Sequence, residues 1–311
     1  MKYRQLGRSG ARVSVIGLGT NRFGAQHVPH AEVCRILDAA SDLGINFLDS
    51  ANVYQGGRSE ETIGAALKGR RSRFIIATKF FNPVGEGPND RGASRLHMQY
   101  AVEDSLRRLQ TDCIDLYYVH RWDPTTPVEE MLRGLDDLVR AGKVRYIGAS
   151  QFMAWQLARA NLLAEIHGWT PFIVIQSHYH MLERGVEQEI LPYCKDQGIG
   201  LIPYFPLAGG FLTGKYQRGK PAPPGSRGET NSYVQQYMVD ANYTKIEKLS
   251  EWAQARGHSL SELAHAWLLA HPEVSSVISG ATRAEQVQQN ALSAEWSLSE
   301  EEMAEINNII G

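Results

Sequence analysis

The chain has 311 residues, a hydrophobic fraction of 43%, a charged fraction of 21% and a formal net charge of -2. This length fits either two ordinary domains or one large α/β barrel, and the composition is that of a soluble globular protein. The nearly balanced charge excludes the broad basic field that nucleic-acid or anionic-membrane binding requires, so we expect neither partner.

The cysteines and the N-terminus predict a cytoplasmic protein. Cys34, Cys113 and Cys194 are widely spaced and form no CxxC pair, which argues against a disulfide framework or a zinc knuckle. The first ten residues, MKYRQLGRSG, contain no apolar core of a signal peptide, and no window approaches 18 consecutive apolar residues.

Segments typical of strands and of amphipathic helices alternate along the whole chain. Strands are predicted at 13–19, 45–50, 74–79, 113–119, 144–149, 172–177, 199–204 and 275–279. Helices are predicted at 31–43, 59–68, 94–109, 128–141, 154–166, 185–197, 242–256, 259–271, 283–291 and, as a surface helix, 298–309. Several helices end at a glycine, as at Gly44, Gly142 and Gly198.

Eight strands that alternate with helices favour a parallel (β/α)8 TIM barrel, and we expect residues 1–311 to form this single domain. The stretch 3–15, broken by Gly7 and Gly10, predicts an N-terminal hairpin that closes the barrel floor. A doubly wound dinucleotide-binding sheet is the rival fold. In GLGTNRFG (17–24) the third glycine falls too late for GxGxxG, and no helical pattern follows directly.

The interval 206–230, PLAGGFLTGKYQRGKPAPPGSRGET, is rich in glycine and proline and too long for a tight connection between a strand and a helix. A long loop on the C-terminal face of a barrel is usually a lid or a binding loop.

Four polar residues lie at or just beyond the ends of successive strands: Asp49, Tyr54, Lys79 and His120. In a parallel barrel these positions converge on one face, so we expect one pocket to hold all four. An ammonium next to a phenol favours the phenolate, a carboxylate holds the lysine charged, and an imidazole can orient a carbonyl oxygen. The set predicts a site that protonates an oxygen as it gains negative charge. Taken singly, Asp49 could cap a turn and Tyr54 could be a packed aromatic residue.

These residues resemble the Asp-Tyr-Lys-His tetrad of the aldo-keto reductases. The resemblance runs along the whole chain through DSANVY, RSEETIGAAL, SLRRLQTDCIDLYYVH, AGKVRYIGAS, LTGKY and GATRAEQVQQN. It is closest to the bacterial stress-type and potassium-channel β-subunit-like branch, because the loop HRWDPTTP is short. The resemblance implies an NADPH-dependent reductase of aldehyde or ketone carbonyls in which Tyr54 is the general acid.

The resemblance also implies a cofactor, NADPH/NADP+, bound extended across the barrel mouth. Ser150 and Gln176 would hold the nicotinamide amide and Tyr204 would stack on its ring. The implied cofactor-binding set is Gly19, Thr20, Asn21, Asp49, Ser150, Gln151, Gln176, Tyr204, Phe205, Pro206, Leu207, Gly209, Lys215, Arg227, Gly280, Thr282, Arg283, Gln286 and Asn290. Independently, GATRAEQ follows a strand and opens a helix, which is a favourable place for an anion.

The sequence departs from the family pattern at two places and leaves the substrate open. Gln151 stands where the family usually has Asn, and Gln55-Gly56 replaces the commoner glycine after Tyr54. The partner we expect is a small-molecule carbonyl substrate, and the sequence sets no oligomeric state. Candidates for an aromatic mouth are Phe23, Phe81, Trp122 and Tyr233.

Three other functions compete with reduction. A class I aldolase would use Lys79 as a Schiff base, which leaves the cofactor-like strand ends unexplained. His178 and His180 resemble an HxH metal pair, but a metallohydrolase needs further ligands and we expect no metal. A cofactor-binding redox sensor or regulatory subunit would keep the cofactor site and turn over little.

Overall fold

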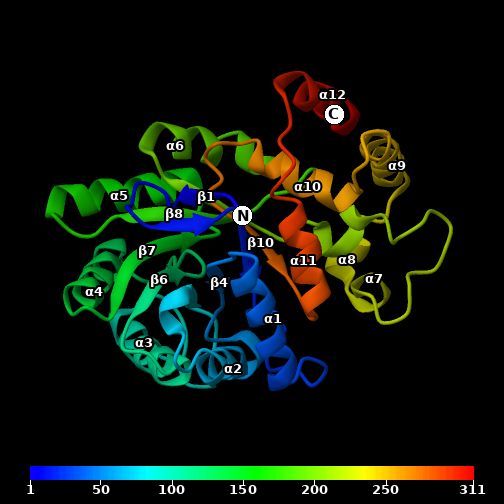
Figure 1. Cartoon of the computed structure of the whole chain (residues 1–311). Helices are drawn as coiled ribbons and strands as arrows, with labels where there is room; N and C mark the ends of the chain where they lie inside the picture. The colour runs from blue at the N-terminus through cyan, green and yellow to red at the C-terminus, as the bar shows by residue number, and fades with distance from the viewer.

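The computed structural model describes all 311 residues and consists of a parallel eight-stranded barrel surrounded by helices (Figure 1). The barrel strands are β3 (Ile16–Gly19), β4 (Phe47–Asp49), β5 (Ile75–Phe80), β6 (Ile114–Val119), β7 (Val144–Ser150), β8 (Phe172–His178), β9 (Gly200–Tyr204) and β10 (Val277–Gly280). The sheet runs from β10 through β3 to β9, and a parallel bridge between Leu201 and Val274 joins its two edges. This confirms the predicted (β/α)8 barrel.

Helices cover the outside of the barrel (Figure 1). The longer ones are α1 (His30–Asp42), α2 (Arg58–Ala66), α3 (Arg95–Leu109), α4 (Val128–Arg140), α5 (Ala154–His167), α6 (Ile190–Gln197), α9 (Asp240–Gln254), α10 (Leu260–Leu269), α11 (Ala284–Leu292) and α12 (Glu300–Ile310). In α4, Val128, Leu132 and Leu135 are buried at helical spacing, which places one apolar stripe against the sheet. None of the helices combines the length and hydropathy needed to cross a bilayer.

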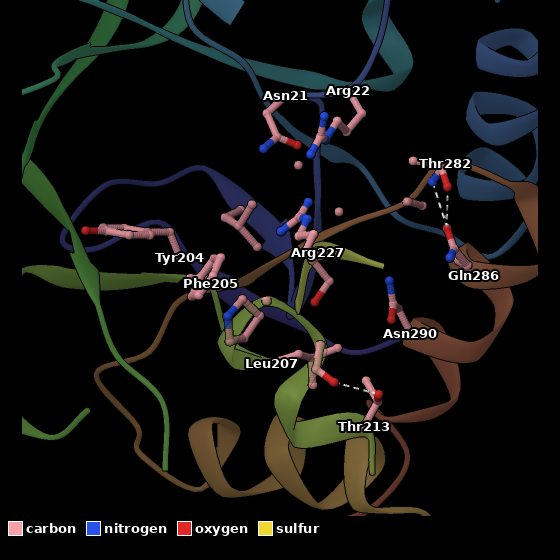
Figure 2. A pocket seen from close by; sticks show the side chains of 18 of the residues that line it. Asn21, Arg22, Tyr204, Phe205, Leu207, Thr213, Arg227, Thr282, Gln286 and Asn290 are labelled. Atoms are coloured by element: carbon pink, nitrogen blue, oxygen red, sulfur yellow. Dashed lines mark hydrogen bonds between the residues drawn. The ribbon is translucent and has the colours of Figure 1, made fainter. Parts of the chain in front are cut away.

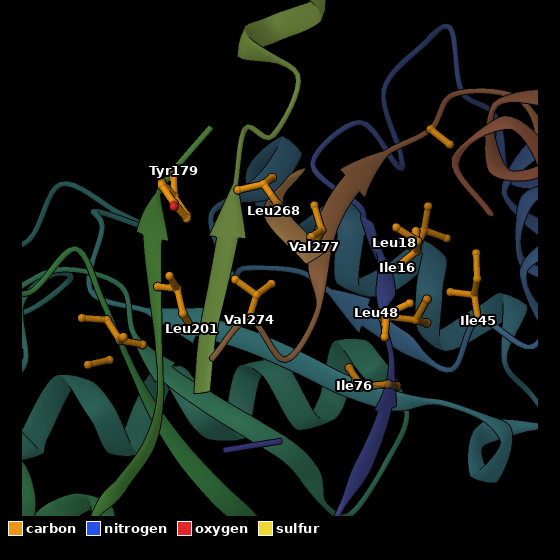
Figure 3. Close-up of a cluster of buried hydrophobic side chains, with 14 of the residues drawn as sticks. Ile16, Leu18, Ile45, Leu48, Ile76, Tyr179, Leu201, Leu268, Val274 and Val277 are labelled. Carbon is orange, nitrogen blue, oxygen red and sulfur yellow. The ribbon is translucent and has the colours of Figure 1, made fainter. Parts of the chain in front are cut away.

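Two hydrophobic clusters lie on the two sides of the barrel wall. The outer cluster has 69 buried residues and joins strand side chains such as Ile16, Leu48 and Leu201 to the surrounding helices (Figure 3). The inner cluster has 10 buried residues, among them Phe47 and Leu116. Because side chains alternate between the two faces of a strand, neighbouring residues such as Phe47 and Leu48 belong to different clusters.

The N-terminal hairpin closes the bottom of the barrel, as predicted. Its strands β1 (Tyr3–Gln5) and β2 (Arg12–Ser14) pair antiparallel, and Leu6 and Val13 complete the inner cluster. The guanidinium of Arg4 donates to the backbone oxygens of His271 at 2.9 Å and Val274 at 2.7 Å, which fastens the hairpin to the strand that closes the barrel.

The structure corrects three predicted segments. The strand predicted at 13–19 is two strands, because β2 belongs to the hairpin and the barrel strand β3 starts only at Ile16. The helix predicted at 185–197 divides into η3 (Gly185–Glu187) and α6 (Ile190–Gln197). Proline is tolerated only in the first turn of a helix, so Pro192 requires a new start near residue 190. The interval 206–230 contains η4 (Ala208–Thr213) and α7 (Arg227–Thr230), and α8 (Ser232–Gln235) follows.

Gly7 supplies a test of the barrel floor. Its φ is +55°, and a Cβ built there would lie 1.9 Å from the backbone oxygen of Ile173, whereas a Cβ at Gly10 meets nothing within 4 Å. We expect Gly7→Ala to lower the free energy of unfolding by about 2–4 kcal/mol through left-handed strain and overpacking. Urea unfolding measures it, with Gly10→Ala as the matched control in the same hairpin. Equal stability of the two variants would contradict the packing described.

Candidate active site

The four strand-end residues lie together at the C-terminal mouth of the barrel. Asp49 ends β4, Lys79 is on β5, His120 follows β6, and Tyr54 opens η1 (Tyr54–Gly57). Lys79 is fully buried, and its Nζ lies 2.6 Å from Asp49 Oδ1. The same nitrogen lies 5.3 Å from the centre of the Tyr54 ring, whose centre is 6.2 Å from that of His120.

Both oxygens of the Asp49 carboxylate have partners. Oδ1 accepts from Lys79, and Oδ2 accepts from Gln176 Nε2 at 2.8 Å. Lys79 also donates to the backbone oxygen of Ser50 at 2.7 Å. Because Gln176 is on β8, one buried network joins three strands across the barrel.

The environment keeps Lys79 charged and Tyr54 protonated. Burial opposes the ammonium, but Asp49 and Tyr54 outweigh it, so the pKa of Lys79 is raised. Burial also raises the pKa of Tyr54; Lys79 opposes this, while Asp49 adds to it. From sequence we expected the neighbouring ammonium to lower the pKa of the Tyr54 phenol, with Tyr54 still acting as the general acid. In the structure desolvation dominates, so Tyr54 is a phenol with a proton to give.

His120 is a neutral hydrogen-bond donor. Burial, Lys79 and Arg121 lower its pKa to about 3. The side-chain nitrogen of Asn82 lies 3.1 Å from His120 Nδ1. An amide nitrogen can only donate, so Nδ1 accepts and the ring proton is on Nε2. Asn82 follows Phe81, whose φ of 136° is a strained conformation for a side chain of this size.

A cavity of about 1310 Å³ is lined by Tyr54 and His120 at one end and by residues at the start of α11 at the other. Figure 2 shows the part between Tyr204 and Gln286. Of the residues predicted for the site, all but two line it: Gly19, Thr20, Asn21, Asp49, Tyr54, His120, Ser150, Gln151, Gln176, Tyr204, Phe205, Pro206, Leu207, Gly209, Lys215, Arg227, Gly280, Thr282, Gln286 and Asn290. Lys79 is buried against Asp49, outside the cavity wall. Arg283 precedes α11 and is exposed, as is Glu285.

The cavity wall carries more positive than negative charge. Arg22, Arg121, Lys215 and Arg227 line it, and none of them forms an ion pair with an acid lining the cavity. The acids are Asp49, which pairs with Lys79, and Glu262, which caps α10. Burial and the nearby Arg22 lower the pKa of Arg227. Figure 2 places these two arginines near each other in the cavity, so this part of it favours an anionic ligand.

Buried polar atoms without partners also line the cavity. Ser150 Oγ is buried and has no hydrogen-bond partner. At the far end of the cavity, by contrast, Gln286 Oε1 has partners, because it accepts from the Thr282 amide at 2.7 Å and from the Thr282 hydroxyl at 3.1 Å. Since buried polar groups are normally satisfied, Ser150 is a candidate to bind a polar ligand group.

Three residues that the sequence argument missed belong to this site: Arg22, Asn82 and Arg121. Each lies within three residues of a predicted site residue. Arg121 is next to His120, Asn82 is three residues beyond Lys79, and Arg22 follows Asn21. Side chains of the loops depend on local backbone conformation, which strand patterns do not supply. The aromatic mouth was predicted less well. Tyr233 lines the cavity, whereas Phe23 is fully buried in the outer core.

The HxH pair is part of an aromatic cluster. His178 and His180 contact each other through their Nε2 atoms at 3.1 Å, and His178 Nδ1 lies 2.9 Å from the Tyr233 hydroxyl. No group of three or more His, Cys, Asp or Glu side chains is placed to hold a metal ion. The two rings pack at the mouth, where His178 stacks on Tyr204.

The state of His120 can be tested by NMR. We expect ¹⁵N spectra to show a neutral ring, protonated at Nε2, throughout the range above its pKa of about 3. In the urea-unfolded chain the same ring titrates near its ordinary value of 6.5. Below pH 6.5 the ring gains a proton in the unfolded chain but not in the native one. The free energy of unfolding therefore decreases as the pH falls from 6.5 towards 3. A native midpoint near 6.5 would contradict the buried environment.

Comparison with known proteins assigns the family. A model described as "Aldo/keto reductase family" matches residues 15–310. A probable voltage-gated potassium channel subunit beta of Oryza sativa subsp. japonica is 40% identical over 297 residues, or 93% of this chain and 90% of the relative. The uncharacterized oxidoreductase YrpG of Bacillus subtilis (strain 168) is 37% identical over 320 residues, or 99% and 96%.

A third relative carries the name of a specific reductase. The L-glyceraldehyde 3-phosphate reductase of Escherichia coli O157:H7 is 36% identical over 325 residues, which span 100% of this chain and 92% of the relative. With the barrel and the matched model, these similarities establish that the chain belongs to the aldo/keto reductase family of oxidoreductases.

Proposed function

We propose that this protein is an NADPH-dependent oxidoreductase that reduces aldehyde or ketone carbonyls to alcohols. The observation that carries the proposal is a protonated Tyr54 beside a buried Lys79–Asp49 pair, at one end of a cavity that Arg22, Lys215 and Arg227 line further along. Reductase names among the relatives support the same reaction class.

In this proposal Tyr54 donates the proton that the carbonyl oxygen gains. Lys79 stabilises the phenolate that Tyr54 becomes, and Asp49 holds the ammonium charged and in place. His120 donates from Nε2 to the carbonyl oxygen, because Asn82 occupies Nδ1. A neutral imidazole orients the substrate without competing with Tyr54 as the acid.

The residues that line the cavity support a nicotinamide dinucleotide as its ligand. Ser150, whose Oγ has no partner, and Gln176 would hold its carboxamide, and the cations Lys215 and Arg227 would bind its phosphate groups. When bound, the reduced nicotinamide would supply the hydride. Family members generally use NAD(P)H, and the preference for NADPH is part of the proposal.

A regulatory role is the second candidate, and the name of the rice relative supports it. A sensor would bind NADPH tightly and reduce aldehydes very slowly. Steady-state turnover with a panel of aldehydes separates the two, since an enzyme of this family should turn over repeatedly on at least one small carbonyl compound.

Tyr54→Phe tests the proton donor. We expect kcat to fall by at least about 10²-fold, because general acid catalysis typically contributes that much, while NADPH binding stays nearly intact. Stopped-flow reduction and fluorescence titration of NADPH measure the two quantities. Tyr117→Phe is the control, since Tyr117 is buried on β6, outside the cavity, and its hydroxyl has no partner.

Lys79→Met supplies a second arm of the same test. Both residues act in one proton transfer, so the losses in the double variant should not add. Near-wild-type turnover in Tyr54→Phe, or full additivity with Lys79→Met, would refute these roles.

Arg283 tests the cofactor preference. It is exposed and in no ion pair at the start of α11, where the family resemblance implies the adenosine 2′-phosphate. A charged hydrogen bond contributes about 1.5–3 kcal/mol, or roughly 10- to 150-fold in affinity. We expect the wild type to prefer NADPH over NADH by that factor and Arg283→Ala to lose most of it. Dissociation constants measure both, with the exposed Arg107→Ala as a control; an unchanged preference would refute the assignment.

A further inference from the structure

Arg121 is a cation at the catalytic end of the cavity that nothing in the protein neutralises. It follows His120 directly, lines the cavity and is exposed. Its side chain takes part in no ion pair and no hydrogen bond within the protein, although arginine offers five N–H donors. A guanidinium with free donors at the mouth of an active site is suited to an anionic group on the substrate.

The neighbouring acids do not compete for Arg121. The closest in sequence, Asp123, is buried and accepts from the Thr125 hydroxyl at 2.6 Å, the Thr126 hydroxyl at 2.8 Å and the Ala93 amide at 2.7 Å. Asp49, the acid in the cavity at this end, is held by Lys79 and Gln176. Arg121 is therefore available to a ligand.

The other cations of the cavity serve a different ligand group in the proposed function. Lys215 and Arg227 line the cavity from the interval 206–230, and Figure 2 shows Arg227 near Arg22 and apart from Tyr204. These residues are placed for the phosphates of the cofactor. Arg121 instead lies on the loop after β6, next to the imidazole that orients the carbonyl. With the cofactor bound, it is the positive charge left for the substrate.

The charge of Arg121 affects the pKa of two side chains at the catalytic end of the cavity. It contributes to the lowered pKa of His120, and it opposes the burial that raises the pKa of Tyr204 to about 12. Trp122 holds this loop, because its ring packs edge-on against Phe152 with centres 5.1 Å apart. Arg121 thus extends from a fixed backbone.

We propose that Arg121 selects small aldehydes that carry a phosphate or carboxylate group a few bonds from the carbonyl. The inference rests on the proposed carbonyl reduction and names its substrate class. Adjacent Cα atoms are about 3.8 Å apart, so the groups that receive the carbonyl and the anion start from neighbouring backbone positions. Long substrates with a distant charge would not place both groups at once.

Matched substrate pairs test the proposal. With saturating NADPH, kcat/KM is measured for glyceraldehyde 3-phosphate against glyceraldehyde, and for succinic semialdehyde against butanal. The first pair tests phosphate and the second carboxylate. We expect the wild type to favour the charged member of at least one pair by about tenfold, the value of one charged hydrogen bond. In Arg121→Ala that ratio should collapse, mainly through a higher KM for the charged substrate.

Two further variants separate recognition from general effects. Arg121→Lys retains the charge without the two-pronged geometry, so it should keep part of the ratio. Lys195→Ala removes an exposed charge on α6 that does not line the cavity, so its ratio should equal that of the wild type. A ratio between substrates is insensitive to the fraction of folded enzyme, so it isolates recognition from stability.

The outcomes distinguish the two proposals. If the wild type reduces neither these four aldehydes nor any compound of the wider carbonyl panel, the proposed function fails and this inference falls with it. If it reduces other carbonyl compounds but none of these four, the role of Arg121 alone is refuted. If it reduces the neutral aldehydes without preferring a charged partner in either pair, the role of Arg121 alone is refuted. A preference that survives Arg121→Ala refutes it equally.

Discussion

The ion pair between Lys79 and Asp49 is the constraint on which the rest of the site depends. Two charges leave water at the mouth of the barrel, and their desolvation is costly unless every remaining donor and acceptor is satisfied. Asp49 therefore needs Gln176 from the opposite side of the barrel, and Lys79 needs the Ser50 carbonyl. The pair also acts on Tyr54, where burial keeps the phenol protonated and the ammonium stabilises the anion that would follow.

Backbone strain gathers at the same mouth. Five of the six residues other than glycine with positive φ lie in the segments that follow barrel strands at this end, namely Gln55, Phe81, Gln151, Phe205 and Ala208, and Gln110 ends α3. Such conformations cost free energy and persist only where the surrounding structure imposes them. At Gln151 the left-handed backbone explains the Asn usual in the family, because Asn tolerates this conformation better than Gln does. The side-chain amide of Gln151 reaches the His120 carbonyl at 3.4 Å, which gives it a local role.

The sequence predicted the barrel and the strand-end residues because both follow from periodic patterns. Buried parallel strands are continuous apolar runs, so the change to Asp49, Lys79 and His120 is visible along the chain. It did not separate β2 from β3, because the apolar run continues through the turn at Val15. It also missed Asn82, Arg22 and Arg121, and it placed Phe23 at the mouth. Whether a loop side chain enters a cavity depends on local φ and ψ, and these have no periodic signal.

Strand-end residues and loop residues of the site differ in how freely they can be replaced. The groups proposed for chemistry come from strand ends held by the barrel core, where a change such as loss of Lys79 leaves a buried charge unpaired. Arg121 comes from a loop, is exposed and has no partner, so replacing it costs the fold little. Substrate selection can therefore change through such loop positions while the residues at the strand ends stay the same. This would allow members of one family to act on different substrates. In this chain the two kinds of position are adjacent. His120 follows a barrel strand and is held by the core, whereas Arg121 is exposed and free to be replaced.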